Sequence, residues 1–352
     1  MNSDQTKKAL IAMSGGVDSS VAAYLMQQQG YTCTSVTMKL FSGSDERVDN
    51  TKDARSVSQA LGIPFCVLDF SEDFHAQVIR RFTEVYKRGA TPNPCIDCNR
   101  YMKFGKLHTY ARQAGMDVLA TGHYARIDQD PVSGRYILKK ALDESKDQSY
   151  VLYALTQEQL AHTAFPLGSL RKQEVRQIAQ QQGFVNAEKS ESQDICFVQD
   201  GDYAGFIERY TGEAYDSGDF IDTEGNVLGR HKGLIHYTIG QRKGLGLSAA
   251  NRMYVCEKNP EDNTVTLGES GDLFSGSLDA VDFHWIAYEN IRNPIRAKAS
   301  IRYRQTPQWA TVTKTSPDSV HIVFDKPQRA IAKGQAVVVY DGDMVVGGGT
   351  IV

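Results

Sequence analysis

The residues from Met13 to Ser20 read MSGGVDSS and follow the short apolar stretch ALIA. Glycines in a turn between a strand and a helix let successive backbone N–H groups point into one concavity, which binds anions together with the helix N-terminus. The serine hydroxyls can donate to phosphate oxygens, and Asp18 can hold a magnesium ion. This segment is therefore a candidate phosphate site.

The same loop lacks the lysine of the Walker pattern, in which Gly-Lys-Ser or Gly-Lys-Thr ends the loop. Without that cation, the loop suits a phosphate group that is left behind better than a γ-phosphoryl group that is transferred. The alternative is a tight strand-to-helix turn in which serine and aspartate only cap the helix.

Three of the six cysteines lie in polar sequence, where a thiol can do chemistry. Cys95 and Cys98 belong to GATPNPCIDCNRYMKFG, and Cys196 belongs to SESQDICFV. Nearby Arg100 and Lys103 predict a positive field that lowers the thiol pKa and favours the thiolate. The remaining three lie in apolar, strand-like runs and are expected to be buried hydrophobic residues: Cys33, Cys66 and Cys256.

The first 200 residues alternate between the two periodicities that position such loops. Strand patterns cover residues 9–13, 34–41, 64–70 and 117–127, and helical patterns cover 19–30, 53–63, 73–89 and 106–115. This alternation predicts βαβ units and a parallel, doubly wound sheet with helices on both faces. Cys95 and Cys98 are expected in an extended loop before the last of these helices, where the side chain of Asp97 would point away from that of Cys95.

The alternation of strand and helix patterns fades after about residue 200. Residues 210–280 are glycine-rich and short-segmented, and residues from about 285 onward form short alternating strands typical of a small β-barrel. We expect a catalytic α/β domain at 1–207, a small central domain at 208–280 and a C-terminal β-barrel at 281–352.

The composition limits the class of protein. A chain of 352 residues suggests two or three domains, and a net charge of −3 excludes a polybasic protein but not a local basic face. Residues 285–352 carry nine Lys and Arg against five Asp and Glu. The N-terminus lacks the apolar region of a signal peptide, and the apolar runs are too short to span a membrane. We expect a cytoplasmic monomer whose cysteines are not a disulfide framework.

Eight motifs occur in order from residue 13 to the C-terminus: SGGVDSS, TPNPCxxCNxxxKF, ATGHYAR, KDQSYVLYAL, ESQDICFV, HxGLxxYTIGQRKGLG, RYRQ and KGQAVVVYDG. With them the chain closely resembles the tRNA-specific 2-thiouridylases over essentially its whole length. That family belongs to the N-type ATP pyrophosphatases, whose PP-loop holds ATP while it is cleaved between the α- and β-phosphates. The resemblance implies a PP-loop ATPase domain followed by a small central domain and a C-terminal β-barrel.

The resemblance also implies an activity. ATP, bound with Mg²⁺, would adenylate the 2-oxygen of the wobble uridine of a tRNA, and sulfur would replace it to give 2-thiouridine, AMP and pyrophosphate. Cys196 would carry the sulfur as a persulfide. Cys98 would attack that persulfide and release sulfide, which leaves a transient Cys98–Cys196 disulfide. Direct attack on the base by the terminal persulfide sulfur stays open.

The family's binding positions transfer to this chain by motif. The positions that match its ATP site are Ala12, Met13, Ser14, Gly15, Gly16, Val17, Asp18, Ser19, Met38 and Gly122. The positions that match its contacts with the target base are Asn93, Pro94 and Cys95. The other positions expected at the tRNA are His123, Lys146, Asp147, Gln148, Arg302, Tyr303, Arg304 and Gln335.

Several of these segments also have ordinary interpretations. The stretch DESKDQSY can be a solvated turn, and HKGLIHYTIGQRKGLG can be either a phosphate-gripping loop or an ordinary basic one. The implied partners are tRNA acceptors for Lys, Glu and Gln, and a cysteine desulfurase or a sulfur-relay protein.

One position departs from the family. Many members have an aspartate where this chain has Cys95, so the general acid or base is open here. Cys95, Cys98 and Cys196 could instead hold a [4Fe–4S] cluster or a zinc ion, although we place the persulfide route first. Two further functions stay open, namely a PP-loop ligase that acts on a small molecule and an RNA- or nucleotide-binding module without catalysis.

Overall fold

The computed structural model describes residues 6–41, 50–189, 195–198, 200–247, 252–289 and 291–352. The chain forms two compact units. The first comprises Met1–Val78, Cys95–Gln193 and Asp343–Val346, and the second comprises Ile79–Pro94, Asp194–Gly342 and Gly347–Val352. Among the described residues, no helix combines the length and the apolar character needed to cross a membrane.

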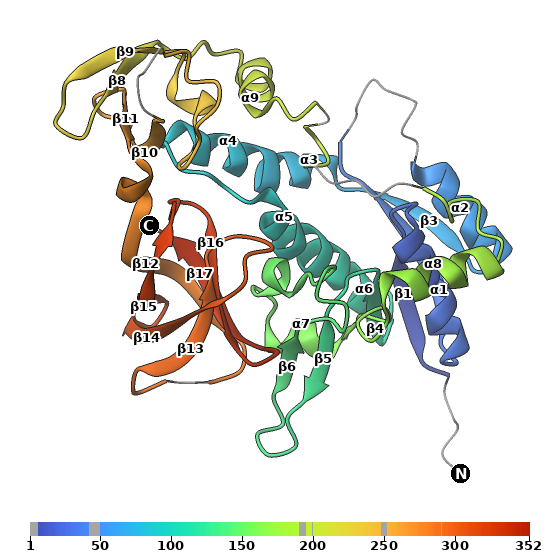
Figure 1. Cartoon of the computed structure of the whole chain (residues 1–352). Coiled ribbons are helices and arrows are strands. Elements are labelled where there is room, and N and C mark those ends of the chain that lie inside the picture. Colours follow the sequence, from blue (N-terminus) through green and yellow to red (C-terminus); the bar gives the residue numbers. More distant parts are fainter. Residues whose placement is uncertain (1–5, 42–49, 190–194, 199, 248–251, 290) are drawn as a thin grey trace. The chain divides into compact units, whose positions relative to one another are not determined.

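The first unit is built on a five-stranded parallel sheet with the strand order β3-β2-β1-β4-β7. Figure 1 labels β1, β3 and β4 of this sheet. Its strands are β1 (Lys8–Ala12), β2 (Thr32–Lys39), β3 (Phe65–Asp69), β4 (Val118–Thr121) and β7 (Thr163–Ala164). Ala12 pairs with Val36 on β2 and with Thr121 on β4, so these three residues share the carboxyl edge of the sheet. The loops that follow β1 and β4 therefore emerge side by side.

Helices cover both faces of this sheet. On one face α1 (Val17–Gln28), α2 (Asn50–Ala60) and α8 (Lys172–Gln181) share a core with Ala9 and Ile11 of β1. Leu10 lies between those two residues and is fully buried toward the opposite face. On that face α6 (His108–Gln113) packs beside β4. The predicted doubly wound α/β architecture is confirmed.

Three segments of this region differ from the sequence prediction. The predicted helix 73–89 contains a π-helical stretch, since α3 (Ser71–Phe74) is followed by η2 (His75–Ile79) and α4 (Arg80–Lys87). The predicted strand 117–127 is two strands, because β4 ends at Thr121 and β5 is Arg126–Gln129. The predicted extended loop at the cysteines is wrong: α5 (Pro94–Asp97), the π-helical η3 (Cys98–Leu107) and α6 follow one another directly.

Short elements complete the first unit. They are β6 (Tyr136–Lys139), η4 (Ser149–Leu152) and α7 (Gln157–Ala161). β5 and β6 form an antiparallel hairpin, and Met344 pairs with Lys139 of β6.

The second unit contains a four-stranded sheet in the order β10-β11-β8-β9. Its strands are β8 (Gly218–Ile221), β9 (Val227–His231), β10 (Tyr254–Asn259) and β11 (Thr264–Gly268), with η5 (Leu234–His236) and η6 (Ser270–Leu273) beside them. A small core around Phe220 and Val265 holds this sheet. A second cluster joins Phe82 and Tyr86 of α4 to Ile207 of α9 (Tyr203–Thr211).

The end of the chain closes into a barrel of six strands. They are β12 (Phe274–Trp285), β13 (Ile295–Ser300), β14 (Gln308–Ser316), β15 (Ser319–Arg329), β16 (Ala336–Asp341) and β17 (Met344–Ile351). The barrel is closed because β12 pairs with β15 on one side and with β17 on the other. The predicted succession of a parallel α/β sheet, a small middle part and a β-barrel is confirmed, while the boundaries at 207 and 280 stay predictions.

Candidate active site

The loop after β1 forms an open nest at the start of α1. Gly15 has a φ of +74°, which glycine adopts without strain. The Ser19 hydroxyl donates to the Gly16 carbonyl at 3.0 Å and accepts the Ser14 N–H at 3.2 Å. Gly16 is the N-cap, and within the described chain no side chain caps the helix there. The first N–H groups of α1 are thus directed into the loop, as an anion site requires.

Gly122, at the end of β4, lies against the start of α1. A Cβ at this position would stand 2.7 Å from the Ser19 nitrogen and 2.8 Å from the Asp18 carbonyl carbon. Only glycine allows this approach, so the loop after β4 forms a second wall of the nest. Met38 lies two residues beyond Val36, the last residue of β2 that pairs with β1. Its backbone therefore extends past the edge of β1, on the side where the nest opens.

Asp18 is bound by protein groups, and the magnesium-holding role expected of it stays a prediction. The Lys172 ammonium donates to both of its carboxylate oxygens, at 2.7 and 2.9 Å, and the Tyr124 hydroxyl donates to one of them at 2.8 Å. Lys172 is buried at the start of α8, and its ammonium also lies 5.7 Å from the centre of the Tyr124 ring. Lys172, 154 positions away in the sequence, thus places a cation beside the loop, where it pairs with Asp18.

Asn186 holds the loop from the other side. Its amide donates to the Gly15 carbonyl and to the Ser20 hydroxyl, both at 3.0 Å. Asn186 is buried, and its Oδ1 has no hydrogen-bond partner among the described residues. Neither Lys172 nor Asn186 carries a local sequence signal for this role, because only the tertiary fold brings them to the loop.

Cys95 lies in α5 and Cys98 begins η3, which continues α5 without a break. The two cysteines are three positions apart in helical backbone and therefore share one face. Pro94 is the first residue of α5, where a missing N–H has no cost. Asp97 is helical, with φ −61° and ψ −43°, and points to a different side from Cys95 because the two are two positions apart. The expectation that Asp97 points elsewhere survives, although the extended geometry assumed for it does not.

The expected lowering of the thiol pKa is wrong for these two cysteines. Burial raises the pKa of the Cys98 thiol, and the positive charge of Lys103 opposes that rise without overcoming it. Cys95 as a residue is exposed, but loss of hydration around its thiol also raises the pKa, again against Lys103. Loss of hydration penalises the charged thiolate more than one lysine stabilises it. All six cysteines lie in the described residues and stand as thiols.

His123, in the loop after β4, connects Lys103 to Thr121 at the end of β4. Its ring is buried, 5.8 Å from the Phe104 ring and 5.9 Å from the Phe165 ring. Nδ1 lies 2.7 Å from the Thr121 hydroxyl, and Nε2 lies 3.3 Å from the Lys103 ammonium. Burial first, and Lys103 second, hold the pKa of His123 well below its usual range. The neutral ring therefore accepts from Lys103 at Nε2 and donates from Nδ1 to Thr121.

The segment Lys146–Gln148 braces the same loop. The Gln148 side chain accepts the Tyr124 N–H at 3.0 Å, while its backbone N–H donates to the Tyr124 carbonyl at 2.9 Å. Asp147 accepts the N–H groups of Ala141 and Ser149. Asp147 and Gln148, both expected at the tRNA, are thus engaged inside the protein.

Cys196 belongs to the second unit and is exposed. It lies in a turn in which the Val198 N–H donates to the Ile195 carbonyl at 2.9 Å. The ring of Phe197 packs edge-on at 5.3 Å from that of Phe82, so the core beside α4 anchors this turn. Residues 190–194, the SESQD part of SESQDICFV, lie outside the described residues.

The barrel carries the remaining predicted tRNA residues. Arg302 and Arg304 are exposed in the turn after β13, and the Arg304 guanidinium lies 5.4 Å from the centre of the Tyr303 ring. Arg302 donates to the Arg329 carbonyl at 3.2 Å. Gln335, before β16, donates to the carbonyls of Thr91 and Pro92.

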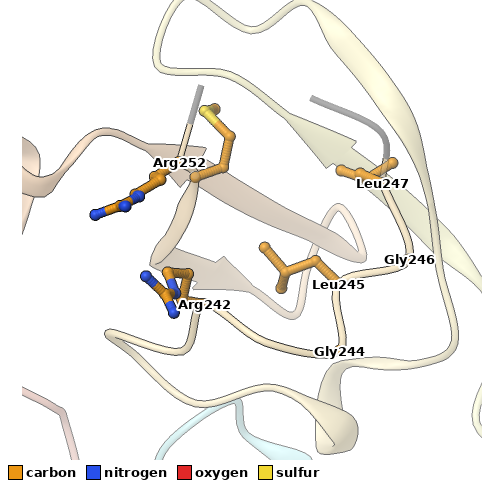
Figure 2. Close-up of a pocket in the computed structure, with 7 residues that line it drawn as sticks. Arg242, Gly244, Leu245, Gly246, Leu247 and Arg252 are labelled. Atoms are coloured by element: carbon orange, nitrogen blue, oxygen red, sulfur yellow. The ribbon is translucent and has the colours of Figure 1, made fainter. Parts of the chain in front are cut away.

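A basic pocket of about 460 Å³ lies in the glycine-rich part of the second unit. Figure 2 shows the side chains of Arg242 and Arg252 on one side of it and those of Leu245 and Leu247 on the other. Two cations facing an apolar wall suit a nucleotide, whose phosphate and base need different surroundings.

Among the described residues, no group of three or more His, Cys, Asp or Glu is placed to hold a metal ion.

Three family profiles match consecutive parts of the chain. A tRNA methyl transferase HUP domain matches residues 7–200, a tRNA methyl transferase PRC-barrel domain matches 204–269, and an aminomethyltransferase beta-barrel domain matches 275–351.

Full-length relatives match nearly the whole chain at about half identity. The tRNA-specific 2-thiouridylase MnmA of Clostridioides difficile is 50% identical over 353 residues, which cover 98% of this chain and 98% of the relative. Proteins of the same name from Carboxydothermus hydrogenoformans and Acetivibrio thermocellus are 48% and 46% identical over 98% of this chain and 97% and 99% of their own length.

Solved structures resemble part of the chain at low identity. The NMN synthetase of Francisella tularensis is 17% identical with a TM-score of 0.35, covering 60% of this chain and 80% of its own. A 4-thiouridine synthetase–RNA complex with bound ATP is 16% identical with a TM-score of 0.35, covering 58% and 50%.

Proposed function

This chain belongs to the tRNA-specific 2-thiouridylase family, and on that premise we propose that it converts the wobble uridine of tRNA to 2-thiouridine with ATP. The resemblance seen in the ordered motifs is thereby confirmed. One observation carries the proposal: relatives of this name match the chain from end to end, and the chain combines a PP-loop nest with the three cysteines at 95, 98 and 196. Ligases that act on small molecules through the same loop need no such thiols.

The first step takes place at the nest. ATP would be held by the loop of residues 12–19, by the backbone at Met38 and by Gly122, with Mg²⁺ as a counterion of its phosphates. The 2-oxygen of the uracil attacks the α-phosphorus, and pyrophosphate leaves into the nest. AMP thereby becomes the leaving group on C2. The uncapped start of α1 and the neutralised Asp18 support this assignment, because both leave the nest attractive to an anion.

The second step delivers sulfur. Cys196 carries a persulfide, which a cysteine desulfurase or a relay protein supplies. The Cys98 thiolate attacks the Cys196 sulfur, forms the Cys98–Cys196 disulfide and releases hydrosulfide. Hydrosulfide attacks C2, AMP leaves, and 2-thiouridine forms. An external dithiol, or two molecules of a thiol, then supplies two electrons to reduce the disulfide before the next turnover.

The raised pKa of Cys98 sets a condition on this step, because the thiol must lose its proton first. The positive charge of Lys103 favours the thiolate, because it lowers the pKa of both Cys98 and Cys95 against the effect of burial. With Cys95 at the position where the resemblance leads us to expect an aspartate, the general acid or base stays unassigned.

An iron–sulfur route remains the alternative. Cys95 and Cys98 on one helical face fit two ligands of a [4Fe–4S] cluster, and Cys196 would supply the third. Such a cluster would bind sulfide at its open iron. A brown colour and iron bound to anaerobically purified protein would favour this route over the persulfide route, and colourless, iron-free protein would exclude it.

The tRNA would be gripped by local basic surfaces, since the whole chain is slightly acidic. Arg302, Arg304 and the pocket of Arg242 and Arg252 are exposed cations suited to phosphates. The wobble base would enter beside Asn93, Pro94 and Cys95, and His123 and Lys146 would lie nearby. We propose a cytoplasmic monomer that acts on the Lys, Glu and Gln acceptors. Binding should weaken steeply with salt, and an affinity unchanged between 50 and 200 mM would contradict this grip.

The test is a reaction with ATP, Mg²⁺, a persulfide donor and unmodified tRNA, followed by mass spectrometry of the nucleosides. We expect 2-thiouridine from the native protein and none from Cys98→Ser or Cys196→Ser, with Cys256→Ser as the matched active control. Activity that survives in both variants, on a small substrate and without tRNA, would favour a PP-loop ligase instead. Absence of any tRNA-dependent pyrophosphate release would favour a module that binds without catalysis.

A further inference from the structure

In the second unit, the loop before β16 is joined to the chain between α4 and α5. The Thr91 N–H donates to the Lys333 carbonyl at 2.8 Å. The Gln335 amide nitrogen donates to the Thr91 carbonyl at 3.0 Å and to the Pro92 carbonyl at 3.2 Å. Residues 333–335, which we name the strap, therefore bind the stretch 91–92 through three hydrogen bonds.

The strap is itself fixed to the barrel. The Gly334 N–H donates to the Ile351 carbonyl, and the Ile351 N–H donates to the Gln335 carbonyl, both at 2.8 Å. Ile351 ends β17, the strand that closes the barrel against β12. A Cβ on Gly334 would come within 3.1 Å of the Thr91 nitrogen and oxygen, and the φ of Gly334 is +87°. Glycine is thus required for the strap to lie this close.

The stretch 91–92 depends on these bonds. It lies between two helices, and Pro92 has no N–H, so neither a helix nor a sheet supplies its hydrogen bonds. Pro92 is buried, and its carbonyl needs a donor that water would otherwise supply. The Gln335 amide meets this need and that of Thr91 together.

Gln335 has little capacity left for RNA. A glutamine amide carries two N–H donors, and two carbonyls accept from this nitrogen. Only its Oε1 acceptor remains, and an acceptor does not bind phosphate. A hydrogen bond from Gln335 to a tRNA phosphate would require it to release Thr91 or Pro92.

We propose that Gln335 is a positioning residue, which holds Thr91 and Pro92 so that Asn93 and Pro94 present the start of α5 to the target base. The barrel, through the strap, thereby sets the segment that leads directly into Cys95 and Cys98. This inference rests on the proposed thiolation for its functional consequence, but the strap itself can be tested without it.

The test compares Gln335→Glu with Gln308→Glu. Glutamate has the same shape but cannot donate to carbonyls. Among the described residues, the Gln308 amide donates to the nearby Thr306 carbonyl alone. Hydrogen exchange of the amides at 89–93 is measured without tRNA, together with the tRNA Kd and the kcat of thiolation. For Gln335→Glu we expect at least tenfold faster exchange at Thr91, a kcat lowered ~10-fold and a Kd within ~3-fold; Gln308→Glu should leave all three unchanged.

Unchanged exchange at Thr91 in Gln335→Glu would overturn the proposal, and so would a weakened tRNA Kd with exchange and kcat intact. If no preparation makes 2-thiouridine, the proposed function fails, yet the exchange result still decides whether the strap holds the segment. Gln335→Ala, which removes the donor without adding charge, should speed exchange in the same peptide. Native exchange at Thr91 in both variants would contradict the strap.

Discussion

The nest at the start of α1 and the cysteine-bearing helix both belong to the first unit, but they treat their polar groups in opposite ways. In the nest, Asp18 is met by Lys172 and Tyr124, and the loop carbonyl of Gly15 is met by Asn186. At the cysteines, burial raises the pKa of both thiols, and a single cation, Lys103, opposes it. The nest is therefore organised in advance to bind an anion. At the cysteines, the raised pKa favours the protonated thiol, so a proton must be removed before either thiol reacts.

The largest effect is expected from Gly122→Ala, which would force a Cβ to within 2.7 Å of the Ser19 nitrogen. The β4 loop or α1 must move, at a cost of about 1–3 kcal/mol in the free energy of unfolding, and we expect ATP affinity to fall ~100-fold. Gly276→Ala is the matched control, because a Cβ there meets open space. Isothermal titration with ATP checks this, and native affinity in Gly122→Ala would show that the nest is not rigid.

Lys172→Met should weaken pyrophosphate and ATP binding by ~10-fold or more, because it leaves the Asp18 carboxylate uncompensated at the helix start. The double variant Asp18→Asn, Lys172→Met removes both charges and should recover most of the affinity for pyrophosphate. Failure of that rescue, measured by titration calorimetry, would mean that Lys172 does more than neutralise Asp18.

A smaller effect is expected from Lys103→Met. A group that reacts as its thiolate gains reactivity tenfold per pH unit up to its pKa, and loss of the Lys103 charge raises the pKa of Cys98 further. Alkylation of Cys98 at pH 8, followed by mass spectrometry of its peptide, should therefore slow ~3- to 10-fold, with the whole pH profile moved to higher pH. Lys106→Met is the control, since Lys106 pairs with Asp73. An unchanged pH profile would show that the charge of Lys103 does not influence the pKa of Cys98.

The same contrast explains what the sequence could predict. The parallel sheet, the nest and the barrel follow from local periodicity and from glycines with defined roles, so Gly15 and Gly122 were recognisable. The helix at the cysteines was missed because Pro92 and Pro94 suggest a loop, although proline is tolerated in the first turn of a helix. Lys172 and Gln335 act on residues 154 and 244 positions away, and no local pattern reports such distances.

The direction of the thiol pKa was also beyond the sequence. Arg100 and Lys103 predicted a positive field, but the burial that outweighs it is a property of the packed helix. Sequence could name the groups and their charges, and only the fold could weigh them against the loss of water.

The most direct measurement is a single turnover by protein whose Cys196 carries an isotopically labelled persulfide sulfur. With ATP and unmodified tRNA, one labelled 2-thiouridine, one AMP and one Cys98–Cys196 disulfide should form per protein. Labelled 2-thiouridine formed without ATP, or formed at the native rate in the Cys98→Ser variant, would contradict sulfur delivery by these two cysteines at an ATP-activated base.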